Sequence, residues 1–370
     1  MTPASGFSRP DVAEPILQSL VDPPWLDDEH RLTGLSGRIR PTAVFASYWH
    51  LACERQRIFY RRLLGRSAPW TADPILATHR FTNTYRASDR VSQYLINTVI
   101  PGSDLSADDI FFRVMLFKTF NRVTTWQLLE GALGPLHWPD IRLEVCDAVL
   151  TRAVKLGSRI YSAAYIMPPP RLGHDLKHRN HLELLRLMMT DHLPDQLAEA
   201  VSLEAAYTLL LAYPSVGPFL AYQYAIDLNY SRLLAFGESD FVVPGPGAAD
   251  GIRKCFVDNN GLSDAELIHL TAEIAIACLD RLELTLPSLW GRPLQLIDYQ
   301  NLYCEVGKYA RKAYPGILGT SARSRIKQRF RPISTPITAR YPDKWGLPSA
   351  AIVVDGVPVP YGQASLVARS

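Results

Sequence analysis

Apolar residues recur at helical spacing along most of this chain, and strand-like alternation is rare. In the segment 41–64, large apolar residues follow one another at three-, four- and seven-residue steps, as one face of a helix requires: Phe45, Tyr48, Ala52 and Phe59. The same reasoning predicts helices at Pro41–Leu64, Ser88–Val99, Ser106–Leu129, His181–Met189, Asp195–Leu211, Pro218–Leu228, Ala248–Val257 and Asp264–Leu282, and one helix or two at Pro139–Ala164. One short β-hairpin is expected at 351–358, around Asp355-Gly356. The chain is therefore predicted to be all-α or mostly α.

The composition divides the 370 residues into three parts. Residues 1–40 are rich in Pro, Gly and Ser and are expected to form an irregular lead-in. Residues 41–315 are predicted to form a helical domain of two lobes with a hairpin at 213–218, and 316–370 a basic, Pro-rich C-terminal extension. A hydrophobic content of 47% is enough to build a sizeable core.

Positive charge is concentrated near the C-terminus, although the net charge of the whole chain is only +3. Between Val306 and Pro342 there is no acid, and the basic residues there are Lys308, Arg311, Lys312, Arg323, Arg325, Lys327, Arg329, Arg331 and Arg340. Such a block can neutralise several phosphates, which indicates nucleic acid as a partner. The alternative is a solvated basic tail.

The five cysteines are scattered and contain no CxxC pair, so a zinc ribbon or an iron–sulfur cluster is disfavoured. We therefore expect no metal and no cofactor. Neither a signal peptide nor an apolar run of membrane-spanning length is visible. These features predict a reduced, cytoplasmic protein that has no contact with a membrane and needs no obligate protein partner.

The segment from Ala212 to Phe256 carries the first candidate site. Its helical run is broken at 214–218 and then resumes, and a Gly-containing turn between helices can aim backbone N–H groups at a phosphate. Further on, a Gly/Pro loop precedes a single acid, Asp250, and an apolar and basic stretch. The expected contacts to a DNA backbone are Ser215, Val216, Gly217, Gly245, Gly247, Arg253, Lys254 and Lys308. The alternatives are an ordinary helix end at the hairpin and a helix cap at Asp250.

Two other strings are unusually dense in amides, aromatic rings and charges, at 69–93 and 298–309. Amides can hydrogen-bond a base edge while aromatic rings stack on it. The residues expected to line a base pocket are Asn83, Arg86, Gln93, Asp298, Asn301 and Glu305. A buried polar network that fixes the fold is the alternative.

Six strings occur in order and together resemble a known family: ERQRIFYRR, PWTADPIL, FTNTYRASDRVSQYLI, VGPFLAYQYAIDLNYS, FVVPGPGAADGIRKCF and LIDYQNLYCEVGKYAR. They resemble the helical domain of 5-hydroxymethyluracil DNA kinases and the related alpha-glutamyl/putrescinyl-thymine pyrophosphorylases. That group is a divergent branch of the helix-hairpin-helix DNA glycosylase superfamily. The resemblance covers roughly residues 40 to 315.

The resemblance implies a helical protein that acts on double-stranded DNA containing hypermodified pyrimidines, as in phage DNA. It implies a catalytic carboxylate at Asp250, which would stabilise positive charge as an N-glycosidic bond breaks. It also implies that Lys118 or Asn121, at the end of FFRVMLFKTFN, fills the hole left by a flipped base. The sequence contains no G-x-x-x-x-G-K-[ST] motif, so kinase activity is not expected.

The leading prediction is a monofunctional DNA glycosylase that excises a hydroxymethyl-derived pyrimidine and leaves an abasic site, in defence against phages. No Lys occurs in the helix after the hairpin, so lyase activity is not expected. One alternative is a base-modifying transferase or pyrophosphorylase that acts on hydroxymethylpyrimidine in DNA. The other is a non-catalytic reader of modified bases.

Overall fold

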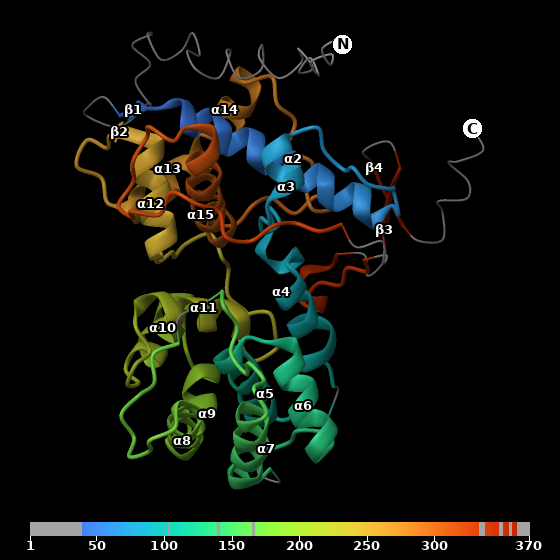
Figure 1. Ribbon diagram of the computed structural model, residues 1–370, viewed down its shortest axis with the longest axis vertical. Coiled ribbons are helices and arrows are strands. Elements are labelled where there is room, and N and C mark those ends of the chain that lie inside the picture. The colour runs from blue at the N-terminus through green and yellow to red at the C-terminus, as the bar shows by residue number, and fades with distance from the viewer. Residues whose placement is uncertain are drawn as a thin grey trace, which may run out of the picture.

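The computed structural model describes residues 39–102, 104–138, 141–164, 167–332 and 337–347, and the backbone of 351–354 and 357–360. The described chain is mostly helical, which confirms the predicted fold class. Its helices form an upper and a lower group, which we call the upper and lower lobes (Figure 1). The chain begins in the upper lobe, builds the lower lobe, and returns to the upper lobe (Figure 1).

The upper lobe contains α2 (Ala43–Leu63), α3 (Pro74–Thr78), α12 (Pro246–Cys255), α13 (Asp264–Glu273), α14 (Ala275–Arg281) and α15 (Leu296–Ala313). The lower lobe contains α5 (Ala107–Phe120), α6 (Val123–Leu133), α7 (Leu143–Lys155), α8 (Lys177–Thr190), α9 (Leu193–Ala198), α10 (Leu203–Leu211) and α11 (Pro218–Leu228). Between the lobes lie the short elements η1 (Arg86–Ser88), α4 (Arg90–Tyr94) and the π-helical η2 (Leu95–Val99). Near the C-terminus, η3 (Asp343–Trp345) forms a single 3-10 turn.

The core of the upper lobe is built on α2. Thr42 caps this helix, because its hydroxyl accepts the Val44 N–H at 3.1 Å. Trp49 and Tyr48 are fully buried. The Tyr48 ring lies 4.7 Å from the ring of Tyr303, so α2 packs directly on α15.

The core of the lower lobe is built on α5 and α11. Ser106 and Asp109 close a capping box at the start of α5. From Asp109 to Phe120 every residue of this helix is buried, and α11 is buried from Leu220 to Leu228. A helix that is buried on all sides belongs to the centre of a bundle.

Several predicted helices differ from the observed ones. The predicted helix at 106–129 is two helices, because Asn121 takes a left-handed conformation with φ 49° and ends α5. Of the one or two helices predicted at 139–164, the described residues contain one, α7. Conversely, α15 was not among the predicted helices, since its many polar residues obscure the helical spacing of its apolar ones.

Strands are few in the described residues. β1 (Arg40–Pro41) pairs antiparallel with β2 (Phe256–Asp258), and this pairing was not predicted. β3 (Ala351–Val354) and β4 (Val357–Pro360) pair antiparallel where the hairpin was predicted. The turn residues 355–356 and the lead-in residues 1–38 lie outside the described chain. Among the described helices, none combines the length and apolar character needed to cross a membrane.

Candidate functional site at the junction of the two lobes

A cluster of buried charges joins the two lobes, and we call it the junction centre: Arg86, Lys118 and Asp227. Asp227 lies on α11 and is fully buried. One carboxylate oxygen is 2.9 Å from Arg86 Nη1 and the other is 3.1 Å from Lys118 Nζ. Because Arg86 comes from η1, between the lobes, and the other two residues come from the lower lobe, these ion pairs tie the connecting segment to the lower lobe.

Hydrogen bonds surround the junction centre. Arg86 Nε donates to Gln223 Oε1 at 3.1 Å, and its Nη1 donates to the Tyr230 hydroxyl at 3.1 Å. The backbone N–H of Arg86 donates to Asp298 Oδ1 at 2.7 Å, which ties η1 to the start of α15. Burial lowers the pKa of Lys118, and the nearby Asp227 carboxylate opposes this shift.

Asp298 is a buried acid with a strongly perturbed titration. Burial raises its pKa to about 7, against the opposing hydrogen bonds from the backbone N–H groups of Arg86 and Gln295. The folded protein therefore binds a proton at Asp298 at a pH where the unfolded chain has already released it.

This shift gives a pH dependence with a definite sign. Since the folded pKa of Asp298 is above the unfolded one, its contribution favours folding as the pH falls through about 7. Between pH 5 and 8, Asp298 should make the free energy of unfolding rise by at most about 1.4 kcal/mol for each unit by which the pH falls, and Asp298→Asn should abolish this contribution. Urea unfolding of both proteins across this range tests it, and identical slopes would contradict it.

Most of the side chains predicted to line a base pocket are bonded within the protein. Asn83 Oδ1 accepts from Arg55 Nη2 at 2.7 Å, and Glu305 Oε2 accepts the Thr82 N–H at 2.9 Å. Gln93 Nε2 donates to the carbonyl oxygen of Ala87 at 2.7 Å. Asn301 is half-buried on α15. The geometry thus matches the alternative of a buried polar network, and base reading by these residues stays a prediction.

The residues predicted to fill the hole of a flipped base lie inside the lower lobe. Lys118 and Asn121 are 2% and 4% exposed, and Lys118 Nζ donates to Asn121 Oδ1 at 2.9 Å. A side chain that enters a base stack must protrude from the surface. We therefore correct this assignment, because Lys118 serves as a buried partner of Asp227 in the described structure.

The hairpin and the Gly/Pro loop are brought side by side. Gly217 is the N-cap of α11 and Gly245 is the N-cap of α12. A Cβ atom on Gly245 would lie 2.5 Å from the Phe219 ring, so the loop packs directly on the first turn of α11. Ser215 and Gly217 are exposed, whereas Val216 is buried.

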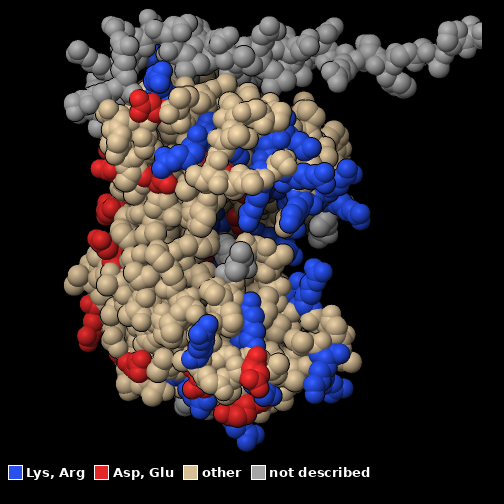
Figure 2. Space-filling view, turned by 60° about the vertical axis from the view of Figure 1, so that its left-hand side comes forward, with Lys and Arg blue, Asp and Glu red and all other residues tan. Residues whose placement is uncertain are grey.

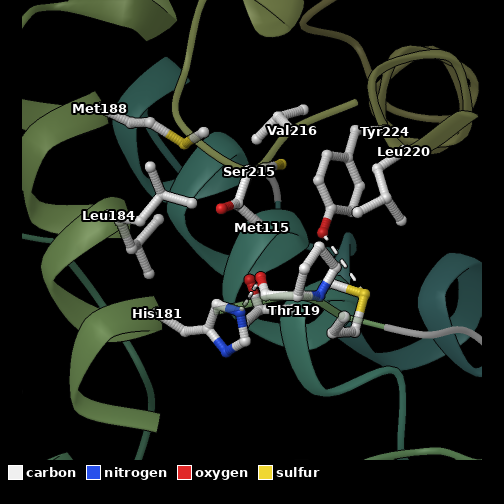
Figure 3. A pocket seen from close by; sticks show the side chains of 12 residues that line it. Met115, Thr119, His181, Leu184, Met188, Ser215, Val216, Leu220 and Tyr224 are labelled. Carbon is white, nitrogen blue, oxygen red and sulfur yellow. Dashed lines mark hydrogen bonds between the residues drawn. The ribbon is translucent and has the colours of Figure 1, made fainter. Parts of the chain in front are cut away.

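A small cavity lies beneath the hairpin, lined by Met115, Thr119, Met167, Pro168, His181, Leu184, Leu185, Met188, Ser215, Val216, Leu220 and Tyr224 (Figure 3). Its volume of about 10 Å³ admits about one water molecule. A nucleobase cannot enter it. A hollow of about 390 Å³ lies on the lower lobe between α7 and α8, beside Asp147 and Arg179.

Asp250 is a buried member of an ion cluster at the fifth position of α12. Its Oδ2 lies 3.1 Å from Lys254 Nζ and 3.6 Å from Arg311 Nη2, and its Oδ1 accepts the Ser321 N–H at 2.8 Å. Burial alone would raise the pKa of Asp250, but the hydrogen bond from Ser321 and the Lys254 ammonium hold it below its ordinary value. Because Gly245 is the N-cap, Asp250 does not cap its helix.

The basic residues predicted at the DNA backbone also have partners within the protein. Lys254 is buried, and its ammonium donates to the Gly307 carbonyl oxygen at 2.9 Å. Arg253 pairs with Asp264 at 3.0 Å, and Lys308 pairs with Glu305 at 2.7 Å. The buried Lys254 cannot reach a DNA strand, which corrects that part of the prediction.

A different set of basic residues lies at the surface of the junction, and we call it the junction strip: Arg80, Arg90 and Arg122. Arg80 and Arg90 are exposed, and Arg122 is half-buried at the start of α6. Burial lowers the pKa of Arg90, and the charges of Arg80 and Arg122 lower it further, so Arg90 lies within electrostatic reach of both other cations. Figure 2 shows Lys and Arg gathered on one side of the molecule and Asp and Glu along the opposite edge.

The chain matches known proteins over most of its helical part. The sequence model of the family described as 5-hmdU DNA kinase, helical domain, matches residues 42–319. A 5-hmdU DNA kinase of Bacillus phage SP10 is 28% identical over 278 residues, which cover 69% of this chain and 43% of the relative. The chain thus matches less than half of that relative's length. No solved structure matches.

These comparisons correct the leading functional prediction. The family and the relative are both named for a DNA kinase, and a kinase is a transferase. Hydrolytic excision of a base, with an abasic product, is therefore not supported. The relative is itself a phage protein, so an expected role in defence against phages gains no support. Since the family model covers most of the described residues, this chain belongs to the family of 5-hmdU DNA kinase helical domains.

Proposed function

We propose that this chain binds DNA containing a 5-hydroxymethyl pyrimidine and takes part in group transfer to that base, which stays in the DNA. The observation that carries the proposal is the junction strip. Its arginines come from the segment after α3, from α4 and from the start of α6, and they place positive charge at the surface where the lobes meet, which a polyanion can neutralise. The phosphodiesters of a DNA strand supply negative charge of this kind.

The reaction proposed is phosphoryl transfer. The hydroxymethyl oxygen of the base attacks the terminal phosphoryl group of a nucleoside triphosphate, losing its proton, and a nucleoside diphosphate leaves. The base–sugar bond is untouched, in contrast to excision. The relative's name supports this choice, against the expectation of no kinase activity that followed from the absent G-x-x-x-x-G-K-[ST] motif.

The hairpin at 213–218 provides a second proposed contact to DNA. Ser215 has φ 63° and is exposed, and the exposed Gly217 opens α11. Backbone N–H groups at a helix start favour a phosphate. We retain the helix-hairpin-helix interpretation for this element as part of the proposal.

Binding to two matched duplexes tests the proposal. One duplex carries a single 5-hydroxymethyluracil and the other carries thymine at the same position, and fluorescence anisotropy gives both affinities over a range of salt concentrations. We expect tighter binding of the hydroxymethyl duplex. Alanine at Arg80, Arg90 and Arg122 should weaken both complexes and make the salt dependence shallower by about 0.9 per lost phosphate contact. Alanine at Arg159, Arg171 and Arg186, three exposed arginines of the lower lobe, is the charge-matched control.

The fate of the base is measured in parallel. After incubation with ATP and Mg²⁺, the DNA is digested to nucleosides and analysed by mass spectrometry. A hydroxymethyl nucleoside that has gained one phosphoryl group supports transfer. A free base in the supernatant, or equal affinity for the two duplexes, would overturn the proposal.

A further inference from the structure

The basic residues of the C-terminal extension lie on a segment that is docked on the upper lobe. We call this segment the strap and define it as residues 319–332. Its exposed basic side chains are Arg323, Arg325, Lys327, Arg329 and Arg331. The strap is attached to two segments of the upper lobe that are far apart in the sequence, one at Asp250 and one at residues 78–80.

The first attachment is at Asp250. A Cβ atom on Gly319 would lie 2.3 Å from Asp250 Oδ1, so the strap backbone passes directly over this carboxylate. The Ser321 N–H then donates to the same oxygen at 2.8 Å. Asp250 is 2% exposed and held by Lys254 and Arg311, so the anchor itself is rigid.

The second attachment is a short antiparallel pairing with the segment after α3. Arg80 N donates to the Gln328 carbonyl oxygen at 3.1 Å, and Phe330 N donates to the Thr78 carbonyl oxygen at 2.9 Å. The Phe330 ring lies 6.0 Å from the ring of Trp70, and Ile326 is buried. The strap is thereby placed beside Arg80, the first residue of the junction strip.

Several basic residues lie around this pairing. Burial lowers the pKa of His79, and Lys312, Arg329 and Lys308 lower it further. Lys312 and Arg329 are exposed. The positive surface therefore continues from the junction strip over the strap to α15.

We propose that the strap is a second DNA-backbone contact, which prolongs the junction strip across the upper lobe and which Asp250 holds in register. A membrane surface would also attract cations, but the described strap presents no run of exposed apolar side chains to enter a bilayer. Spaced cations on a fixed backbone suit the phosphates of a duplex. The proposal rests on the proposed DNA binding.

Removal of charge is the first test. Alanine at Lys327, Arg329 and Arg331 should weaken binding to the hydroxymethyluracil duplex about tenfold or more, and should make the salt dependence shallower by about one unit per lost contact. Alanine at Arg159, Arg171 and Arg186 again serves as the control. An unchanged affinity and slope would overturn the strap proposal, while the proposed function would stand if alanine at Arg80, Arg90 and Arg122 still weakened binding.

Displacement of the strap without any change of charge is the second test. Gly319→Ala forces a Cβ atom against Asp250, whereas a Cβ atom on Gly316 meets nothing within 4 Å. We expect Gly319→Ala to weaken DNA binding several-fold and Gly316→Ala to leave it unchanged, with the helical circular dichroism of both kept. Equal affinities for the two variants would contradict an anchored strap. Cosedimentation with vesicles that contain phosphatidylserine tests whether the strap binds a membrane surface instead. If the strap substitutions weakened binding to the vesicles but not to DNA, the proposal would be overturned.

Discussion

Asp227→Ala is expected to destabilise the protein by about 3–5 kcal/mol, because it leaves Arg86 and Lys118 as buried cations without their shared carboxylate. This is a large part of the 5–15 kcal/mol that stabilises a typical domain. The loss should appear in urea unfolding followed by circular dichroism at pH 7. DNA binding should fall in parallel, since the junction centre holds the lobes that carry the junction strip.

Two comparisons separate this effect from the mere loss of an ion pair. Glu183 pairs with the exposed Arg186 in the same lobe, so Glu183→Ala should cost about 1 kcal/mol or less. Adding Lys118→Met to Asp227→Ala removes one of the two orphaned cations. The double variant should therefore be more stable than the sum of the single effects predicts, and simple additivity would contradict the buried pairing.

The regular parts of the fold follow from local patterns. The predicted bounds of Pro218–Leu228 agree with those of α11, because Pro218 starts the helix and apolar residues fill it. The helix α15 was not predicted, because Asp298, Gln300 and Glu305 interrupt its apolar pattern. These polar residues are nevertheless buried, by contacts with other parts of the chain. Local propensity does not reveal such contacts.

The candidate site was recovered only in part. The sequence singled out Arg86 for a base pocket and Lys118 for filling the hole of a flipped base, whereas in the structure both pair with the Asp227 carboxylate. Asp227 gave a signal in the sequence, as the single acid of an apolar helix, and a buried acid requires a cation. Its partners come from distant segments, so only the tertiary structure names them. The junction strip likewise consists of three arginines that are ordinary in the sequence, and folding brings Arg80 and Arg122 within electrostatic reach of Arg90.

The reaction was the least predictable feature. Excision and phosphoryl transfer both begin with a modified pyrimidine in a duplex, so a basic surface and a hairpin fit either one. In the sequence, Asp250 is an isolated acid after a Gly/Pro loop, and for this reason it was predicted to be the catalytic carboxylate of an excision reaction. In the folded chain its carboxylate is held by Lys254, Arg311 and the Ser321 N–H.

The closest helix packing in the upper lobe gives the other large expected effect. A Cβ atom on Gly251 of α12 would lie 1.9 Å from the Tyr303 carbonyl oxygen of α15, a contact that no side-chain rotation can relieve. Gly251→Ala must therefore push the two helix backbones apart. We expect the free energy of unfolding to fall by about 3 kcal/mol or more, as in a severely overpacked core, although alanine has a better helix propensity than glycine.

Two other helical glycines make this prediction sharp. A Cβ atom on Gly307 would lie 2.9 Å from the Cα of Gly251, so Gly307→Ala should be destabilising but less so. A Cβ atom on Gly131 of α6 meets nothing within 4 Å, and Gly131→Ala should stabilise the protein by about 0.5–1 kcal/mol. Thermal and urea unfolding of the three variants should thus rank Gly131→Ala above Gly307→Ala and Gly251→Ala last. A Gly251→Ala protein as stable as Gly131→Ala would show that α12 and α15 do not meet backbone to backbone, and the placement of Asp250 beneath the strap would fail with that contact.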